Sequence, residues 1–153
     1  MNILVVGSGI MGNGIAQVFA QAGYKVVLHD VNMEILDVAR QNIAGQLAMM
    51  AQNDLISEQI INITLQNIRL SDNLADCTQD TDMVIEAIPE KLALKENLFS
   101  QLETLCPPKT IFATNTSGIS INKLAQGLQR KSKLVGTHFF MPAHLIPLVE
   151  VIC

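Results

Sequence analysis

The chain alternates between two hydrophobic patterns. Short runs of consecutive apolar residues, rich in β-branched side chains, are typical of strands buried on both faces of a parallel sheet. Between them lie segments in which apolar residues recur every three or four positions, which is typical of helices that pack one face on a core. The first pattern predicts strands at residues 2–6, 24–30, 68–71, 82–88, 110–115, 133–140 and 147–152. The second predicts helices at about residues 15–22, 33–51, 57–66, 90–105 and 120–128.

The first predicted strand leads directly into a glycine-rich loop, GSGIMG at residues 7–12. Such a loop alone is a weak signal, but this one follows a strand and opens a helix, and Asp30 ends the next strand eighteen residues after Gly12. Gly7 permits a tight turn, Gly9 lets the backbone approach a pyrophosphate, and Gly12 lets the helix pack close to the sheet. This order predicts an α/β fold of the doubly wound Rossmann type, a mostly parallel sheet with helices on both faces.

The ligand that this loop predicts is NAD. The free N–H groups at the helix start and the helix dipole favour phosphates. Ile10 and Met11, inside the glycine motif, are predicted to contact the cofactor with the glycines. The carboxylate of Asp30 can accept hydrogen bonds from both ribose hydroxyls and would repel a 2′-phosphate, so NAD is favoured over NADP. The alternative is a glycine turn without a ligand and a solvated aspartate.

Composition narrows the classes of protein. The 153 residues suffice for one domain with a hydrophobic core, and 49% hydrophobic against 16% charged residues exclude a disordered chain. A net charge of −4 and the absence of lysine or arginine runs argue against nucleic-acid and membrane partners. Cys77, Cys106 and Cys153 lack the spacing of metal ligands, so we expect no metal and reduced, packed thiols in a cytoplasmic protein.

Three residues near the ends of the later strands form a candidate catalytic group. His138 and Glu150 lie on neighbouring predicted strands, and Ser117 follows another strand at its carboxyl end, where ligands bind in open α/β sheets. A histidine can take or return a hydroxyl proton near neutral pH, a carboxylate can fix its tautomer, and a serine can hold the substrate oxygen. From spacing alone, a packed core histidine and a paired structural glutamate are the alternatives.

Two other histidines receive different predictions. We expect His29 to pack on the face of the sheet opposite to Asp30. His144 lies in a loop, where it is either solvated or part of a substrate pocket.

Several separated motifs together are more specific than the glycine loop. They are GSGIMGNGIAQVFAQAGYKVVLHD, DMVIEAIPEKLALKENLF, TIFATNTSGISI and GTHFFMPAHLIPLVEVI. With these motifs the chain resembles, from Met1 to Cys153, the NAD-binding domain of the 3-hydroxyacyl-CoA dehydrogenase family. The resemblance implies oxidation of an L-3-hydroxyacyl-CoA with NAD, as in fatty acid β-oxidation.

The resemblance also implies roles for single residues. His138 is the expected general acid/base with Glu150 as its partner, and Ser117 is expected to bind the substrate hydroxyl near the nicotinamide. Three further positions, Glu90, Lys95 and Asn115, match family positions that contact the cofactor.

The sequence departs from the family pattern in two places. Met141 stands where the family has an asparagine that contacts the cofactor. Family members that use CoA carry basic residues on the helix after the second strand, whereas here the stretch 42–57 has no lysine or arginine, and Gln46 and Asn53 fall near the family's CoA-contacting serine and lysine. The substrate is therefore open between a CoA thioester and a small free hydroxy acid of the carnitine or L-gulonate type. A cofactor-binding module that is inactive on its own is a further alternative.

The family continues with an all-helical domain that closes the substrate cleft and carries the dimer interface. We expect residues 1–153 to be the NAD-binding domain alone, with that second domain absent from this chain and a homodimer in the intact enzyme. Apolar residues on the helix at 33–51, Met33, Met49 and Met50, are expected to face that domain or a partner subunit. The mean hydropathy of +0.32 agrees with such a surface.

Overall fold

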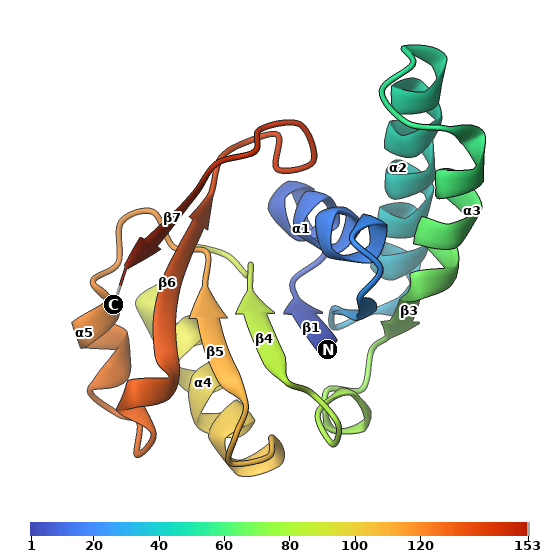
Figure 1. Ribbon diagram of the computed structural model, residues 1–153. Helices are drawn as coiled ribbons and strands as arrows, with labels where there is room; N and C mark the ends of the chain where they lie inside the picture. Colours follow the sequence, from blue (N-terminus) through green and yellow to red (C-terminus); the bar gives the residue numbers. More distant parts are fainter. Residues whose placement is uncertain (153) are drawn as a thin grey trace.

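One sheet organises the part of the chain that the computed structural model describes, residues 1–152. Its strand order is β3-β2-β1-β4-β5-β6-β7 (Figure 1). The strands are β1 (Asn2–Val6), β2 (Lys25–His29), β3 (Ile68–Ser71), β4 (Met83–Glu86), β5 (Ile111–Thr114), β6 (Leu134–Phe139) and β7 (Val149–Ile152). The first six pair in parallel, and β7 runs antiparallel to β6. The chain winds outward from β1 on one side and then resumes at β4 on the other, so the doubly wound prediction is confirmed.

Helices cover both faces of this sheet. They are α1 (Ile10–Gln21), α2 (Met33–Gln52), α3 (Glu58–Asn67), α4 (Leu92–Leu105) and α5 (Ile121–Ala125), with 3-10 turns η1 (Ala75–Cys77) and η2 (Lys131–Lys133). Side chains of β1 alternate between two cores: Ile3 and Val5 pack with α1 and α2, whereas Leu4 packs with α4. A strand buried on both faces needs apolar residues at every position, which explains the unbroken run of β1.

The predicted elements all occur, and most of their ends lie within two residues of the prediction; α1 begins at Ile10, five residues before the helical spacing that starts at Ile15. The largest functional difference is at α4, which begins at Leu92 rather than at Glu90. The N–H of Lys91 donates to the carbonyl of Pro89 over 2.7 Å, so residues 89–91 form a turn before the helix. Glu90 is thereby free to point toward the loop after β5.

The two cysteines that the structure describes are packing residues. Cys77 and Cys106 are buried and free, and burial raises the pKa of the Cys106 thiol to about 11. The prediction for Cys153 lies outside the described residues.

Part of the exposed apolar surface lies on α2, where Met33 and Met49 are exposed (39% and 65%). Within residues 1–152, no helix combines the length and apolar character needed to cross a bilayer.

Candidate cofactor and catalytic site

The glycine loop lies at the carboxyl end of β1, and each glycine meets a different steric demand. Gly7 has φ +99°, and a Cβ there would come within 2.6 Å of the Ala87 carbonyl oxygen. A Cβ on Gly12 would lie 1.7 Å from the carbonyl oxygen of Gly7, so helix and loop can approach only through a glycine. A Cβ on Gly9 would meet nothing within 4 Å. The backbone at Gly9 is therefore open to a ligand.

The start of α1 offers hydrogen-bond donors to that open space. Gly9 is the N-cap of α1 and provides no side-chain cap, and Ile10 is 71% exposed. The first N–H groups of a helix, here those of Ile10 and Met11, have no partner within the helix. Together with the helix dipole they suit a pyrophosphate. This geometry fits a dinucleotide at the predicted place.

Asp30 is held beside the loop by Ser8. Its Oδ2 accepts the Ser8 N–H at 2.7 Å and the Ser8 hydroxyl at 2.8 Å, and its Oδ1 accepts the Val31 N–H at 2.8 Å. Burial alone would raise the pKa of Asp30, but the hydrogen bonds from Ser8 and Val31 outweigh it and hold that pKa below its usual range. The carboxylate is thus ionised and oriented at the end of β2. Ser8 was not predicted from the sequence, where its position inside the glycine motif is the only signal for it.

A buried ion pair lies at the carboxyl end of β4. Glu86 and Lys95 are 0% and 1% exposed, and Lys95 Nζ lies 2.6 Å from Glu86 Oε1. Lys95 Nζ also lies 3.1 Å from Oε2 of Glu90, whose side chain is 42% exposed. Glu86 was not predicted either, although an acidic residue inside the apolar run of β4 is unusual enough to mark it.

Glu90 organises the turn after β5. Its Oε1 accepts the Thr116 hydroxyl and, at 3.2 Å each, the N–H groups of Ser117 and Gly118. Burial alone would raise the pKa of Glu90, but the hydrogen bonds from Thr116 and Lys95 hold it below its usual range. The Ser117 side chain is left exposed at the carboxyl edge of the sheet.

His138 and Glu150 face each other across the β6–β7 pair. They are partners in the antiparallel register, and His138 Nδ1 lies 2.9 Å from Glu150 Oε2. Their side chains are 24% and 57% exposed. Asn115 joins this region to β5, because its Oδ1 accepts the Phe139 N–H at 2.8 Å. The structure thus brings the predicted histidine and glutamate together and places Asn115 next to the same strand.

The remaining predicted positions lie around this edge. His29 is buried, with Nδ1 2.9 Å from the carbonyl oxygen of Ser71, as expected of a packing residue. His144 is half-buried, which lowers its pKa, and it lines a cavity of about 170 Å³ that also contacts Gln46 and Asn53 on α2. A role of His144 in substrate binding stays a prediction. Met141 is 67% exposed.

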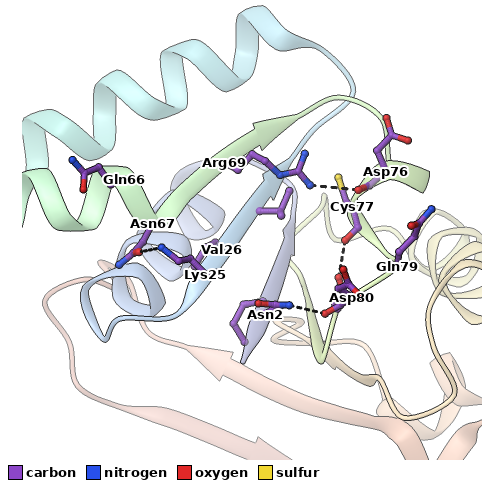
Figure 2. A pocket seen from close by; sticks show the side chains of 13 residues that line it. Asn2, Lys25, Val26, Gln66, Asn67, Arg69, Asp76, Cys77, Gln79 and Asp80 are labelled. Atoms are coloured by element: carbon purple, nitrogen blue, oxygen red, sulfur yellow. Dashed lines mark hydrogen bonds between the residues drawn. The ribbon is translucent and has the colours of Figure 1, made fainter.

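Another cavity, of about 360 Å³, lies at the amino ends of the strands, opposite to the carboxyl ends that carry the glycine loop (Figure 2). Residues at the amino ends of β1, β2 and β3 line it, and their polar groups bond to one another: Lys25 Nζ donates to Asn67, and Asn2 Nδ2 donates to the Asp80 carbonyl. Ligands of open α/β sheets bind outside the carboxyl ends of the strands. This cavity is therefore separate from the predicted cofactor site.

A glycine loop at the start of α1, an oriented acid after β2 and a His–Glu pair at the carboxyl edge define a dinucleotide-binding domain of the dehydrogenase class. Residues 2–153 match the family described as 3-hydroxyacyl-CoA dehydrogenase, NAD binding domain, and the chain belongs to that family. NAD is the cofactor of this domain, as the sequence predicted.

Relatives and a solved structure agree with this assignment. The mitochondrial hydroxyacyl-coenzyme A dehydrogenase of Rattus norvegicus is 38% identical over 99% of this chain and 50% of its own length. A peroxisomal fatty acid beta-oxidation multifunctional protein of Oryza sativa subsp. japonica is 37% identical over 98% of this chain and 20% of its own length. The crystal structure of 3-hydroxybutyryl-CoA dehydrogenase from Escherichia coli superposes with a TM-score of 0.95 at 37% identity, covering 99% of this chain and 32% of that one.

The relatives are longer than this chain. It spans half the length of the rat relative and a fifth of the rice relative. Because these two are described as mitochondrial and peroxisomal, the relatives do not confirm the cytoplasmic location that the sequence predicted.

Proposed function

We propose that this chain is the cofactor half of an oxidoreductase that transfers a hydride between NAD and carbon 3 of an L-3-hydroxyacyl-CoA. The observation that supports this most strongly is the contact of 2.9 Å between His138 Nδ1 and Glu150 Oε2 at the carboxyl edge, where the cofactor of such a domain binds. The proposal assigns to the cofactor the residues Gly7, Gly9, Ile10, Met11, Gly12, Asp30, Glu90, Asn115 and Ser117. Lys95, the remaining position expected to contact the cofactor, is 1% exposed and is assigned a supporting role behind Glu90 instead.

In this proposal His138 is the general acid/base. Glu150 holds Nδ1 of the ring, which leaves Nε2 to take the proton of the substrate hydroxyl and to return it in the reverse reaction. The carboxylate also stabilises the imidazolium that forms. The exposed hydroxyl of Ser117 orients the substrate oxygen, and its backbone is fixed by Glu90. When bound, NAD supplies the hydride acceptor at C4 of its nicotinamide.

The thioester form of the substrate rests on the relatives, which are described as acting on CoA compounds. A free hydroxy acid is the second candidate, and the cavity beside α2 favours it. Gln46 and Asn53, which line that cavity, are uncharged, as is the whole stretch 42–53. The phosphates of CoA are commonly bound by lysine and arginine. A CoA substrate would therefore need cations from outside the stretch 42–53.

The completion of the site by a second, helical domain is also part of the proposal. Homodimerisation belongs with it, because the apolar residues exposed on α2 and β7 suit a covered surface: Met33, Met49, Val151 and Ile152 are 39%, 65%, 65% and 46% exposed. If these 153 residues act alone, we expect NADH binding without turnover.

The test is NADH oxidation by the longest protein that the source gene encodes. Acetoacetyl-CoA is offered in one assay, and free 3-oxo acids including 3-dehydrocarnitine in another. We expect turnover of the thioester. Turnover of a free acid alone would move the enzyme to the small hydroxy-acid branch. NADH binding with no turnover of either would leave only the binding module.

A further inference from the structure

The carboxylate of Glu86 is sealed inside the domain as a charged acceptor. Its Oε1 accepts the Ile88 N–H at 2.8 Å and Lys95 Nζ at 2.6 Å, and its Oε2 accepts the Thr114 hydroxyl at 2.5 Å. Both oxygens serve as acceptors, as in an ionised carboxylate. Because Glu86 is 0% exposed, it reaches no ligand directly.

Lys95 is equally enclosed. Its three ammonium protons match three acceptors: Glu86 Oε1 at 2.6 Å, Glu90 Oε2 at 3.1 Å and the Ile88 carbonyl at 3.4 Å. Its side chain is 2% exposed. Family resemblance suggested that Lys95 contacts the cofactor, but here its charged end lies behind Glu90. Glu90 is the member of the three that faces outward.

The charges of the three side chains do not cancel. Two carboxylates oppose one ammonium, so the cluster Glu86–Lys95–Glu90 carries one net negative charge, and Glu90 brings that charge to the surface. The same Glu90 oxygen accepts the N–H groups of Ser117 and Gly118. The excess charge therefore lies directly beside the turn that carries Ser117.

Strand order places this charge at one end of the cofactor. Asp30 follows β2, the glycine loop follows β1, Glu86 ends β4 with Glu90 in the turn after it, and Ser117 follows β5; the strands β2, β1, β4 and β5 are adjacent in that order. A dinucleotide with its adenosine ribose at Asp30 and its pyrophosphate at the loop extends toward β4 and β5. Its nicotinamide ring carries a positive charge in NAD⁺ and none in NADH.

We infer that the Glu86–Lys95–Glu90 cluster is a specificity device that favours the oxidised over the reduced cofactor. Glu90 supplies the charge, while Glu86 and Lys95 are positioning residues that hold Glu90 against the Ser117 turn. The inference rests on the proposed function, because it takes the nicotinamide end of the cofactor to lie beside Ser117. It assigns to Glu86 an effect on a ligand that it does not touch.

Separate titrations of NAD⁺ and NADH test this inference without any turnover. Glu90→Gln is expected to raise the ratio of the NAD⁺ Kd to the NADH Kd about fivefold, from the loss of one charge at a partly exposed site. Glu86→Gln leaves the cluster neutral and is expected to move the ratio in the same direction, about threefold. A purely structural role would weaken both nucleotides equally. An unchanged ratio in Glu90→Gln overturns the inference. This test holds even if Glu86→Gln, which changes a fully buried residue, fails to fold.

Two further variants sharpen the result. Glu96→Gln removes an exposed carboxylate from α4, the helix that carries Lys95. It is expected to leave the ratio of the NAD⁺ Kd to the NADH Kd unchanged. The double variant Glu86→Gln with Lys95→Met keeps the net charge at minus one but removes the support of Glu90. It is expected to keep the ratio within about twofold of the parent while weakening both nucleotides together. Unweakened binding in this variant would refute the positioning roles.

Asp30→Ala separates this inference from the proposed function. If Asp30→Ala weakens neither nucleotide, the cofactor site itself is misassigned and the proposed function fails. If Asp30→Ala weakens the binding of both nucleotides while Glu90→Gln leaves the ratio of their Kd values unchanged, the cofactor site stands. Only the specificity role of the Glu86–Lys95–Glu90 cluster then fails.

Discussion

The two halves of the site are built in different ways. The first half, from the glycine loop to Asp30, comes from 24 consecutive residues, 7–30, and depends on backbone geometry around β1, α1 and β2. The second half joins side chains from β4, β5, β6 and β7, which are as far apart in sequence as Glu86 and Glu150. The contrast shows that the glycine loop and Asp30 lie in one short stretch, whereas the sheet alone brings the His138–Glu150 pair together with Glu90 and Ser117.

The halves also differ in what a substitution can do. In the first half the demands on the loop are steric, because glycines leave room for the backbone or for a ligand, and Asp30 is the charged group to which the loop leads. In the second half they are electrostatic, because buried or partly buried charges depend on their partners. Substitutions in the first half should therefore alter folding or nucleotide affinity. Substitutions in the second half should alter turnover and the preference between NAD⁺ and NADH.

The largest effect is expected from His138→Gln. Loss of the general acid/base should lower kcat of the full-length enzyme about 1,000-fold, within the range for this kind of catalysis. The NADH Kd, measured by titration, should stay near the parent value, because the first half of the site is untouched. A variant that keeps its turnover would show that the second half is not catalytic.

Next in size is the effect of Gly12→Ala on stability. The added Cβ would lie 1.7 Å from the Gly7 carbonyl oxygen, so helix and loop must separate, at an expected cost of about 3 kcal/mol in the free energy of unfolding. Gly45→Ala is the matched control. Gly45 lies within α2 with nothing near its added Cβ, and alanine there should stabilise by about 0.5–1 kcal/mol. Urea unfolding of both variants measures the difference, and equal stability would refute the steric account.

Gly9→Ala should separate binding from folding within the same loop. Its added Cβ meets nothing within 4 Å in the protein, so unfolding should be almost unchanged. The methyl group would occupy the space through which a pyrophosphate approaches, and the NADH Kd should rise about tenfold. Tight NADH binding by this variant would place the pyrophosphate elsewhere.

The smallest effect is expected from Asp30→Ala on cofactor choice. Removing a carboxylate near the 2′ position should raise the NADPH-to-NADH affinity ratio about fivefold, because the repulsion of the 2′-phosphate is lost. Binding titrations with both nucleotides measure this ratio. If it stays constant, Asp30 does not face the 2′ position.

Much of this architecture is determined by local patterns. The apolar run of β1 and the glycines after it predicted a strand, a turn and a helix, because each rests on short-range sterics and burial. Asp30 was found in the same way, from its distance to the loop. The pairing of His138 with Glu150 was predicted as plausible, and the β6–β7 register now places them in contact.

The residue order did not reveal that Glu86, Glu90 and Lys95, which lie within ten residues of one another, form one charge cluster. In the sequence Glu86 is a single acid in an apolar strand, and Lys95 is a single lysine on a helix. Their enclosure behind Glu90 depends on α4 packing against β4 and on the turn after β5, which no local spacing encodes. The glycine spacing is visible in the residue order because the turn and the contact of Gly12 with Gly7 are local, although Gly7 also meets the Ala87 carbonyl after β4. A buried charge, in contrast, is set by every element that surrounds it.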